Sequence, residues 1–305
     1  MKILIATQKP FANKAINQMK QKIEESSNKM ILFENYTSQS DLVEAVGPCD
    51  AMIIRSDKIT KEVIEKAKNM KIIVRAGAGY DNVDLDAANK QNIVVMNTPG
   101  QNSNAVAELA LGLMIYATRN LFDGSSGSEL LGKKLGVHAY GNISSNLCKK
   151  AKALGMEVYA HSRTRKRTEA DGVKYIKDAS ELYSFCDFVS LHLPKNKTTE
   201  KSINYTLLSR MREKTVLINT ARAELINEED LLKIMTEKPK FKYMSDVAPK
   251  RVKEFKEKFS ERFFSPPKKM GAQTAEANIN AGIAAVEQIN RFFAYDDTTF
   301  KVNEV

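Results

Sequence analysis

The sequence has few cysteines, no tryptophan and no long hydrophobic run. Its three cysteines, Cys49, Cys148 and Cys186, lie far apart among 305 residues. A scattered, odd-numbered set favours neither a disulfide framework nor a CxxC-type metal site, so we expect no metal and a reducing, cytoplasmic compartment. No segment approaches the roughly 20 apolar residues that a membrane-spanning helix requires. The opening MKILIATQKP lacks the long apolar core of a secretory signal, so we expect neither a membrane nor secretion.

The charged residues give the chain a net charge of +10 at pH 7. The lysines are spread along the whole chain and do not gather with aromatic residues into basic blocks, which argues against a nucleic-acid partner. We assign most of this charge to solvated helix faces. The excess still favours small anionic ligands through the summed electrostatic field.

Short, β-branched apolar runs recur along the chain and are separated by amphipathic segments, the pattern of buried parallel strands alternating with helices. The first series reads KILIAT, KMILFE, AMIIRS, KIIVRAG and NIVVMNT, and the second reads KLGVHAYG, MEVYAHS, DFVSLHLP, TVLINTA and FKYMSDV. A helix predicted over Ala105–Arg119 separates the two series. We therefore predict an α/β fold with two doubly wound parallel sheets.

A second long helix is predicted over Thr274–Ala294, after the second sheet is complete. It is expected to return to the first sheet, which makes the first domain discontinuous. The predicted domains are residues 1–98 plus 275–305 and residues 99–274.

The stretch KLGVHAYGNISSN resembles a dinucleotide-binding loop that has lost two of its three glycines. Those glycines permit a tight turn, close approach to the pyrophosphate and close packing of helix on strand. Ala139, Gly141 and Ser144 occupy these positions, so the phosphate-facing glycine remains and small side chains replace the other two. A positive φ at Ala139 would cost about 1 kcal/mol. A plain strand-to-helix connection is the alternative.

The end of the next predicted strand lacks the carboxylate that accepts from the ribose hydroxyls of NAD. Ser162 stands there, followed by Arg163 and Arg165. A hydroxyl and a guanidinium fork suit a 2′-phosphate, which a carboxylate would repel. This favours an NAD(P) site with a preference for NADP(H), although a basic surface turn would look the same.

Several longer stretches resemble one family over nearly the whole chain. They are RAGAGYDNVD, VMNTPGQNSNAVAELALG, SLHLP and LINTARAELINEEDL. Together they resemble the D-2-hydroxyacid dehydrogenases, most closely the short-form 3-phosphoglycerate dehydrogenases without a regulatory tail. The resemblance implies a flavodoxin-like substrate domain, a Rossmann cofactor domain, an active site in the cleft between them, and hydride transfer between the substrate C2 and a nicotinamide.

The resemblance also implies roles for individual residues. Arg222 in NTAR matches the arginine that orients the substrate carboxylate and carbonyl, a task that suits a planar bidentate donor. The substrate-binding positions are Arg55, Ser56, Arg75, Gly77, Ala78, Gly79 and Asn102. The cofactor-binding positions, besides Gly141 and the ribose residues, are Tyr140, Asn142, Ile143, His192, Leu193, Pro194, Thr220, Ala221 and Asp246. Two arginines beside a glycine turn favour a phosphorylated substrate.

The chain departs from the family at its catalytic pair. The usual histidine position carries Lys269, in PPKKMG, and the usual glutamate position carries Arg251. A protonated lysine can donate a proton in the reductive direction without any shift, and as a base it needs its pKa lowered from about 10.4. One branch of the phosphoglycerate dehydrogenases has this lysine, and HAYGN and KKMGAQTAEANINAG resemble that branch. Lys268 is the competing candidate, which alignment to Gly271 disfavours.

The function that the resemblance implies is oxidation of 3-phosphoglycerate to 3-phosphohydroxypyruvate in serine biosynthesis, or its reverse. One alternative is an NADPH-dependent glyoxylate or hydroxypyruvate reductase. A second is a catalytically inactive, dinucleotide-sensing interaction protein that has lost the histidine and glutamate. The family implies a homodimer formed through the cofactor domain.

Overall fold

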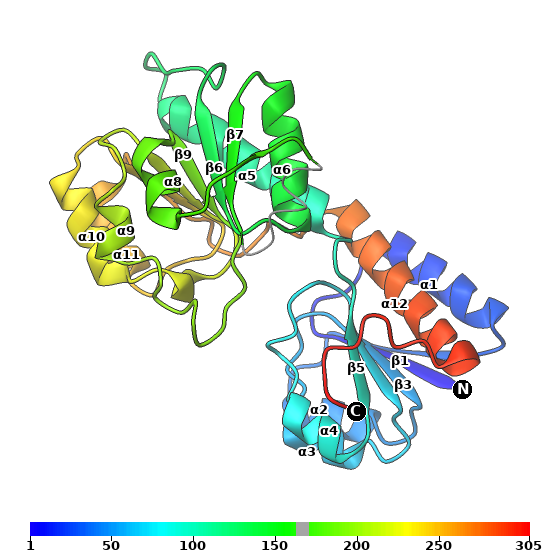
Figure 1. The fold of residues 1–305 in the computed structure, drawn as a ribbon. Helices are drawn as coiled ribbons and strands as arrows, with labels where there is room; N and C mark the ends of the chain where they lie inside the picture. The colour runs from blue at the N-terminus through cyan, green and yellow to red at the C-terminus, as the bar shows by residue number, and fades with distance from the viewer. Residues whose placement is uncertain (163–170) are drawn as a thin grey trace. The chain divides into compact units, whose positions relative to one another are not determined.

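The computed structural model describes residues 1–162 and 171–305, which form two compact units. The first unit contains residues 1–102 and 272–305, and the second contains residues 103–271 (Figure 1). Each unit is built around one parallel sheet, so the predicted α/β class is confirmed. No helix in the described ranges is long and apolar enough to cross a membrane.

The sheet of the first unit contains all five strands predicted from the first series. They are β1 (Lys2–Thr7), β2 (Lys29–Glu34), β3 (Ala51–Ile54), β4 (Ile72–Arg75) and β5 (Val94–Asn97), in the order β2-β1-β3-β4-β5. Every neighbouring pair is parallel. The order reverses between β1 and β3, as in flavodoxin-like sheets.

Helices cover both faces of this sheet. They are α1 (Asn13–Glu25), α2 (Gln39–Ala45), α3 (Lys61–Lys66), α4 (Leu85–Lys90) and α12 (Ala275–Tyr295). The helices α1 and α12 lie side by side on one face, and α2, α3 and α4 share a core on the other (Figure 1). The Thr274 side chain caps α12 by accepting from Ala277 N–H, and Asp296 ends it with a φ of 52°.

Among the described residues, the sheet of the second unit has seven strands, of which the sequence predicted five. They are β6 (Lys134–His138), β7 (Glu157–His161), β8 (Lys174–Tyr175), β9 (Phe188–Leu191), β10 (Val216–Asn219), β11 (Lys242–Ser245) and β12 (Phe263–Phe264). Their order is β12-β11-β10-β9-β6-β7-β8. The direction of winding reverses between β6 and β9, which is where open α/β sheets bind ligands at their carboxyl ends.

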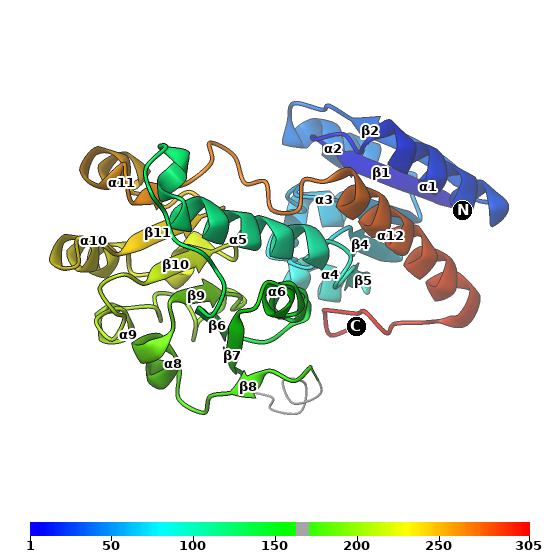
Figure 2. The same ribbon diagram turned by 90° about the horizontal axis from the view of Figure 1, so that it is seen from above.

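Two layers of helix enclose this second sheet. Their elements are α5 (Ser103–Thr118), η1 (Asn120–Phe122), α6 (Asn142–Ala153), α8 (Ala179–Phe185), α9 (Tyr205–Leu208), η2 (Ala223–Leu225), α10 (Glu228–Glu237) and α11 (Val252–Phe259). The helices α5 and α6 pack on one face, and α8, α9 and α10 pack on the other (Figure 2). Each of the three cysteines is buried with a free thiol.

Candidate active site

The carboxyl ends of five neighbouring strands lie at one edge of the second sheet. These strands end at His138, His161, Leu191, Asn219 and Ser245, and parallel pairing brings the residues that follow them to the same edge. The loops that begin there, and the first turn of α6, carry the predicted cofactor residues Tyr140, Gly141, Asn142, Ile143, Ser162, His192, Leu193, Pro194, Thr220, Ala221 and Asp246. Arg163 and Arg165, which the sequence assigned to the ribose phosphate, lie outside the described residues.

The two lost glycines of the loop are replaced by residues that contact each other. Ala139 has a φ of 74°, so the positive φ considered from the sequence is present. The Ser144 hydroxyl is buried and donates to the Ala139 carbonyl oxygen at 2.8 Å. The turn is therefore strained at Ala139, and the serine fixes its carbonyl.

Gly141 has room for a ligand that approaches from outside the loop. It precedes α6 with an extended backbone, φ −121° and ψ −158°, which any residue can adopt. A Cβ at this position would meet no heavy atom within 4 Å. The open space lies at the N-terminus of a twelve-residue helix, where backbone N–H groups attract phosphate. The Tyr140 hydroxyl does not point into this open space, since it donates to Asp171 at 2.7 Å.

Two buried polar atoms at this edge have no hydrogen-bond partner among the described residues. They are Nδ1 of His192, which follows β9, and Oγ1 of Thr220, which follows β10. Buried polar groups are normally satisfied. These two atoms and the open space at Gly141 together fit a dinucleotide along the carboxyl edge. Ser162, buried at the end of β7, leaves no carboxylate at the ribose position.

His138 and His192 at this edge are held in their neutral form. Burial, and next the neighbouring His161, lower the pKa of His138 to about 4. Burial, and next His138, lower the pKa of His192 to about 3. The His138 ring also shares a hydrogen bond with the Tyr183 hydroxyl at 3.0 Å. Near neutral pH these imidazoles therefore bring polarity to the edge without charge.

The candidate catalytic cations meet at one main-chain oxygen. Arg222 Nη1 donates to the Ala221 carbonyl oxygen at 3.0 Å, and Lys269 Nζ donates to the same oxygen at 3.4 Å. Asn219 shapes this turn, because its side chain accepts from Ala221 N–H and donates to the Arg222 carbonyl, both at 3.0 Å. Lys269 is exposed and Arg222 is half-buried. Two cations at one point suit an anionic substrate with a polarised carbonyl.

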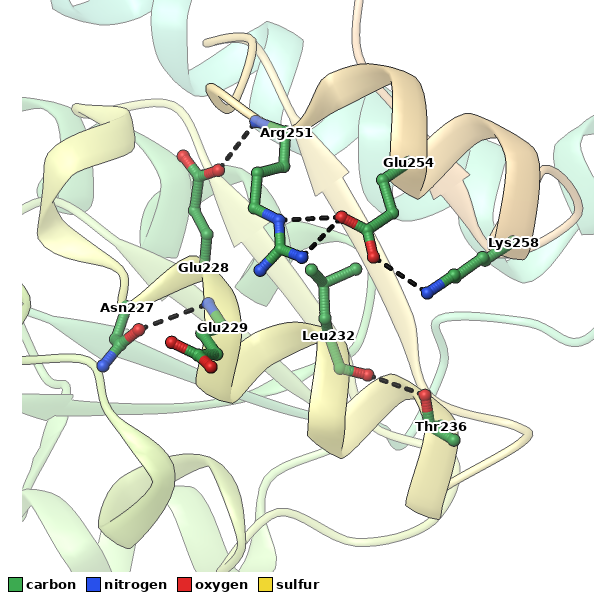
Figure 3. Close-up of polar contacts among 8 residues, drawn as sticks. All are labelled: Asn227, Glu228, Glu229, Leu232, Thr236, Arg251, Glu254 and Lys258. Carbon is green, nitrogen blue, oxygen red and sulfur yellow. Dashed lines mark hydrogen bonds and ion pairs between the residues drawn. The ribbon is translucent and has the colours of Figure 1, made fainter.

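The residue at the family's glutamate position makes a separate network at the helix surface. Arg251 donates through Nε to Glu254 at 2.7 Å, and Lys258 donates to the same carboxylate at 2.8 Å (Figure 3). Glu228, the first residue of α10, accepts from Arg251 N–H at 2.9 Å and so connects α10 to the start of α11. Lys258 and Arg251 lower the pKa of Glu254. Arg251 thus supports the α10–α11 packing.

The first unit carries the other predicted substrate residues, and its structure gives Arg55 a task that the sequence did not predict. Arg55 is buried, and its Nη1 donates to the carbonyls of Lys9 and Pro10, both at 3.0 Å. Its Nη2 donates to Gln273 and Asn278. All four terminal N–H groups of the guanidinium have protein acceptors. Arg55 therefore connects the segment after β1 to the start of α12, and it is poorly placed to bind phosphate.

Arg75 lies over the glycine turn that was predicted to bind an anion. A Cβ on Gly77 would lie 1.5 Å from Arg75 Nη1, so the guanidinium occupies the space that only a glycine leaves. Gly77 has a φ of 146°. Arg75 Nε donates to the Arg55 carbonyl at 3.0 Å, which orients the group. The guanidinium is therefore held against Gly77, at the start of the turn that continues through Ala78 and Gly79.

Ser56 and Asn102 are the other two residues of the first unit that were predicted to bind substrate, and their roles stay predictions. Ser56 is exposed just beyond β3, and Asn102 is partly exposed at the end of the unit. The structure adds no contact that assigns either a role. Sequence reasoning missed Asn219 as the residue that shapes the Arg222 turn, although Asn219 is the first residue of the NTAR motif.

Comparison with known proteins gives consistent similarities. Residues 5–303 match the model of the D-isomer specific 2-hydroxyacid dehydrogenase catalytic domain. The NAD⁺-bound 3-phosphoglycerate dehydrogenase structure from Entamoeba histolytica is 41% identical, with a TM-score of 0.93 and coverage of 100% of this chain and 99% of that one. Hydroxypyruvate reductase from Thermotoga maritima is 35% identical, over 83% of this chain and 88% of that protein. D-3-phosphoglycerate dehydrogenase from Methanocaldococcus jannaschii is 33% identical over 83% of this chain, which spans about half of that protein, 52%.

Replacing Ser144 with alanine tests the fixed loop. Ser144→Ala leaves the Ala139 carbonyl without its donor, which should lower the free energy of unfolding by about 1–2 kcal/mol and weaken dinucleotide binding. Urea unfolding and fluorescence titration with NADPH measure the two effects. Ser145→Ala is the matched control, because this neighbouring hydroxyl bonds Asp171, which has Tyr140 as a second donor. Equal losses in both variants would contradict the account.

Acidification tests the neutral state of His138. An unfolded histidine binds a proton below its ordinary pKa of 6.5, whereas folded His138 binds one only near 4. Stability should therefore fall as the pH drops from 6.5 to 4, by up to about tenfold in the unfolding constant per pH unit for this one group. Denaturant unfolding across that window should be less pH-dependent in His138→Asn. An unchanged pH dependence of stability in His138→Asn would refute this assignment.

Proposed function

Because the chain belongs to the D-isomer specific 2-hydroxyacid dehydrogenase family, whose members are nicotinamide-dependent oxidoreductases, we propose that it interconverts 3-phosphoglycerate and 3-phosphohydroxypyruvate. The observation that carries the proposal is the 41% identity to a 3-phosphoglycerate dehydrogenase over the full chain. The charge of Arg75 at the Gly77 turn supports a phosphorylated substrate.

The residues described above can divide the reaction between them. A bound nicotinamide dinucleotide supplies the hydride or accepts it. Arg222 is a planar donor that can pair with the substrate carboxylate and polarise the C2 carbonyl. Lys269, held beside Arg222 on the Ala221 carbonyl, can donate a proton to the C2 oxygen during reduction and receive it during oxidation. A lysine needs no carboxylate to select a tautomer, which agrees with the engagement of Arg251 elsewhere.

A second function is favoured by one specific similarity. The hydroxypyruvate reductase of Thermotoga maritima covers this chain as well as the archaeal phosphoglycerate dehydrogenase does, at similar identity. Its named substrate lacks a phosphate. The two candidates therefore differ in whether a phosphate-binding charge is needed.

We infer a preference for NADP(H) over NAD(H). The inference rests on buried Ser162 at the end of β7, where a ribose-binding carboxylate would otherwise stand, and on the arginines that follow it in the sequence. The NAD⁺ bound to the Entamoeba histolytica relative argues in the other direction.

The assembly and location follow from the same proposal. Ile115, Phe122 and Leu131 are large apolar side chains that remain exposed on the cofactor unit, as expected if α5 and the segment after it form a homodimer. Sedimentation equilibrium would give the mass of a single chain if the homodimer does not form.

Three free thiols suit a reducing compartment such as the cytoplasm.

Initial rates with two substrates and two cofactors test the proposal directly. We expect reduction of 3-phosphohydroxypyruvate, with a higher kcat/KM than hydroxypyruvate and with NADPH preferred over NADH at least tenfold. A preference for hydroxypyruvate would favour the reductase. Dinucleotide binding without turnover of either acid would contradict both enzymes.

Arg75→Gln tests phosphate recognition. Loss of the charge should lower kcat/KM for 3-phosphohydroxypyruvate about 100-fold, a loss typical of one charge-assisted pair, and leave hydroxypyruvate within about threefold. Arg55→Gln serves as the comparison, because its structural contacts predict lower thermal stability and a similar loss with both substrates. Equal effects of Arg75→Gln on the two substrates would remove Arg75 from the phosphate site.

Replacing each of the adjacent lysines separates the two candidates for proton transfer. Lys269→Ala should lower kcat by about 10²–10⁴-fold, the usual contribution of a general acid, with dinucleotide affinity nearly unchanged. Lys268→Ala should stay within about threefold of wild type. The assignment fails if the larger loss belongs to Lys268.

A further inference from the structure

Asp246 is a buried carboxylate at the end of β11 that binds the main chain just beyond Lys269. Its side chain is 1% exposed. Oδ1 accepts from Met270 N–H at 2.8 Å, and Oδ2 accepts from Gly271 N–H at 3.0 Å. Charge-assisted bonds to two successive N–H groups fix both the position and the orientation of a short segment.

The close approach of this carboxylate depends on Gly271. A Cβ at that position would lie 2.7 Å from Asp246 Oδ2 and 3.5 Å from a methyl group of Leu109. Real side chains do not tolerate the first of these distances. Glycine is thus required so that the segment can rest on the carboxylate.

The same contacts connect Lys269 to the turn that carries Arg222. Asp246 N–H donates to the Asn219 carbonyl at 3.0 Å, and the Asn219 side chain holds the Ala221–Arg222 turn. Lys269 reaches the Ala221 carbonyl from the segment that Asp246 holds. Two neighbouring strand ends, β10 and β11, therefore fix the main chain beneath both cations.

We propose that Asp246 is a positioning residue for Lys269: it holds the Met270–Gly271 main chain so that the lysine amine lies on the Ala221 carbonyl beside Arg222. The resemblance to the family implied a different role, contact with the cofactor. The inference rests on the proposed function, in which Lys269 transfers the proton.

A double-mutant cycle distinguishes the two roles. In Asp246→Asn one of the two N–H groups faces an amide NH₂ instead of an acceptor, so Lys269 should shift and kcat should fall about 10- to 100-fold. In the Lys269→Ala background the same change should cost less than threefold, because the group being positioned is gone. The KM for NADPH should change by less than twofold. A full loss that persists without the lysine, or a raised KM for NADPH, would overturn the proposal in favour of cofactor contact.

Hydrogen exchange measures the contact without any turnover. Peptides that cover residues 266–275 should exchange at least tenfold faster in Asp246→Asn and in Gly271→Ala than in wild type. Asp187→Asn is the matched control, because Asp187 accepts from Lys134 N–H at 2.8 Å at the opposite end of the same sheet. Unchanged exchange in the 266–275 peptides would overturn the proposal even if both variants lost activity.

These readouts keep the proposal separate from the substrate assignment. The cycle can be run with whichever oxo acid the enzyme reduces, so failure with 3-phosphohydroxypyruvate alone affects only the proposed substrate. If neither acid is reduced, the proposed function fails, and hydrogen exchange still decides whether Asp246 holds the segment.

Discussion

The carbonyl oxygen of Ala221 is the point on which the candidate catalytic site depends. Arg222 and Lys269, from segments far apart in the chain, both donate to this oxygen. Two like charges side by side would repel each other without a shared acceptor, so the position of the carbonyl sets the spacing of the cations. Asn219 fixes the carbonyl from β10, and Asp246 fixes the lysine segment from β11. In the proposed mechanism one lysine takes the place of the family's histidine and glutamate, and the main chain orients that lysine.

In the predicted cofactor loop, one replacement of a glycine stabilises the turn that the other replacement strains. Ala139 adopts a left-handed backbone that glycine would adopt at no cost, and Ser144 occupies the place of the packing glycine. The serine hydroxyl reaches the alanine carbonyl, so the second departure stabilises the turn that the first one strains. Gly141 alone keeps its glycine, and it is the position where the structure leaves open space. A dinucleotide phosphate would approach the loop through that space.

The sequence predicted the strands well because buried parallel strands are short, β-branched and continuous. It missed β8 and β12, which are two-residue edge strands with no hydrophobic period to detect. It predicted catalytic roles for Lys269 and Arg222 through family motifs, and these stay predictions, but it could not show that the two side chains share an oxygen. It assigned Arg55 to the substrate, whereas four protein acceptors surround its guanidinium, and such long-range contacts leave no local signal. The contacts of Asp246 with Met270 and Gly271 were hidden for the same reason, since these partners lie 24 and 25 residues away.

The central claim is that a lysine amine performs the proton transfer at this site, and chemical rescue tests it most directly. Lys269→Ala would be assayed for oxo-acid reduction in the presence of small primary alkylamines of graded pKa and similar size. The account predicts that the rate rises with ammonium concentration and that its logarithm varies linearly with amine pKa, as general acid catalysis requires. A variant that binds dinucleotide and keeps its residual rate unchanged at every amine concentration would contradict the claim.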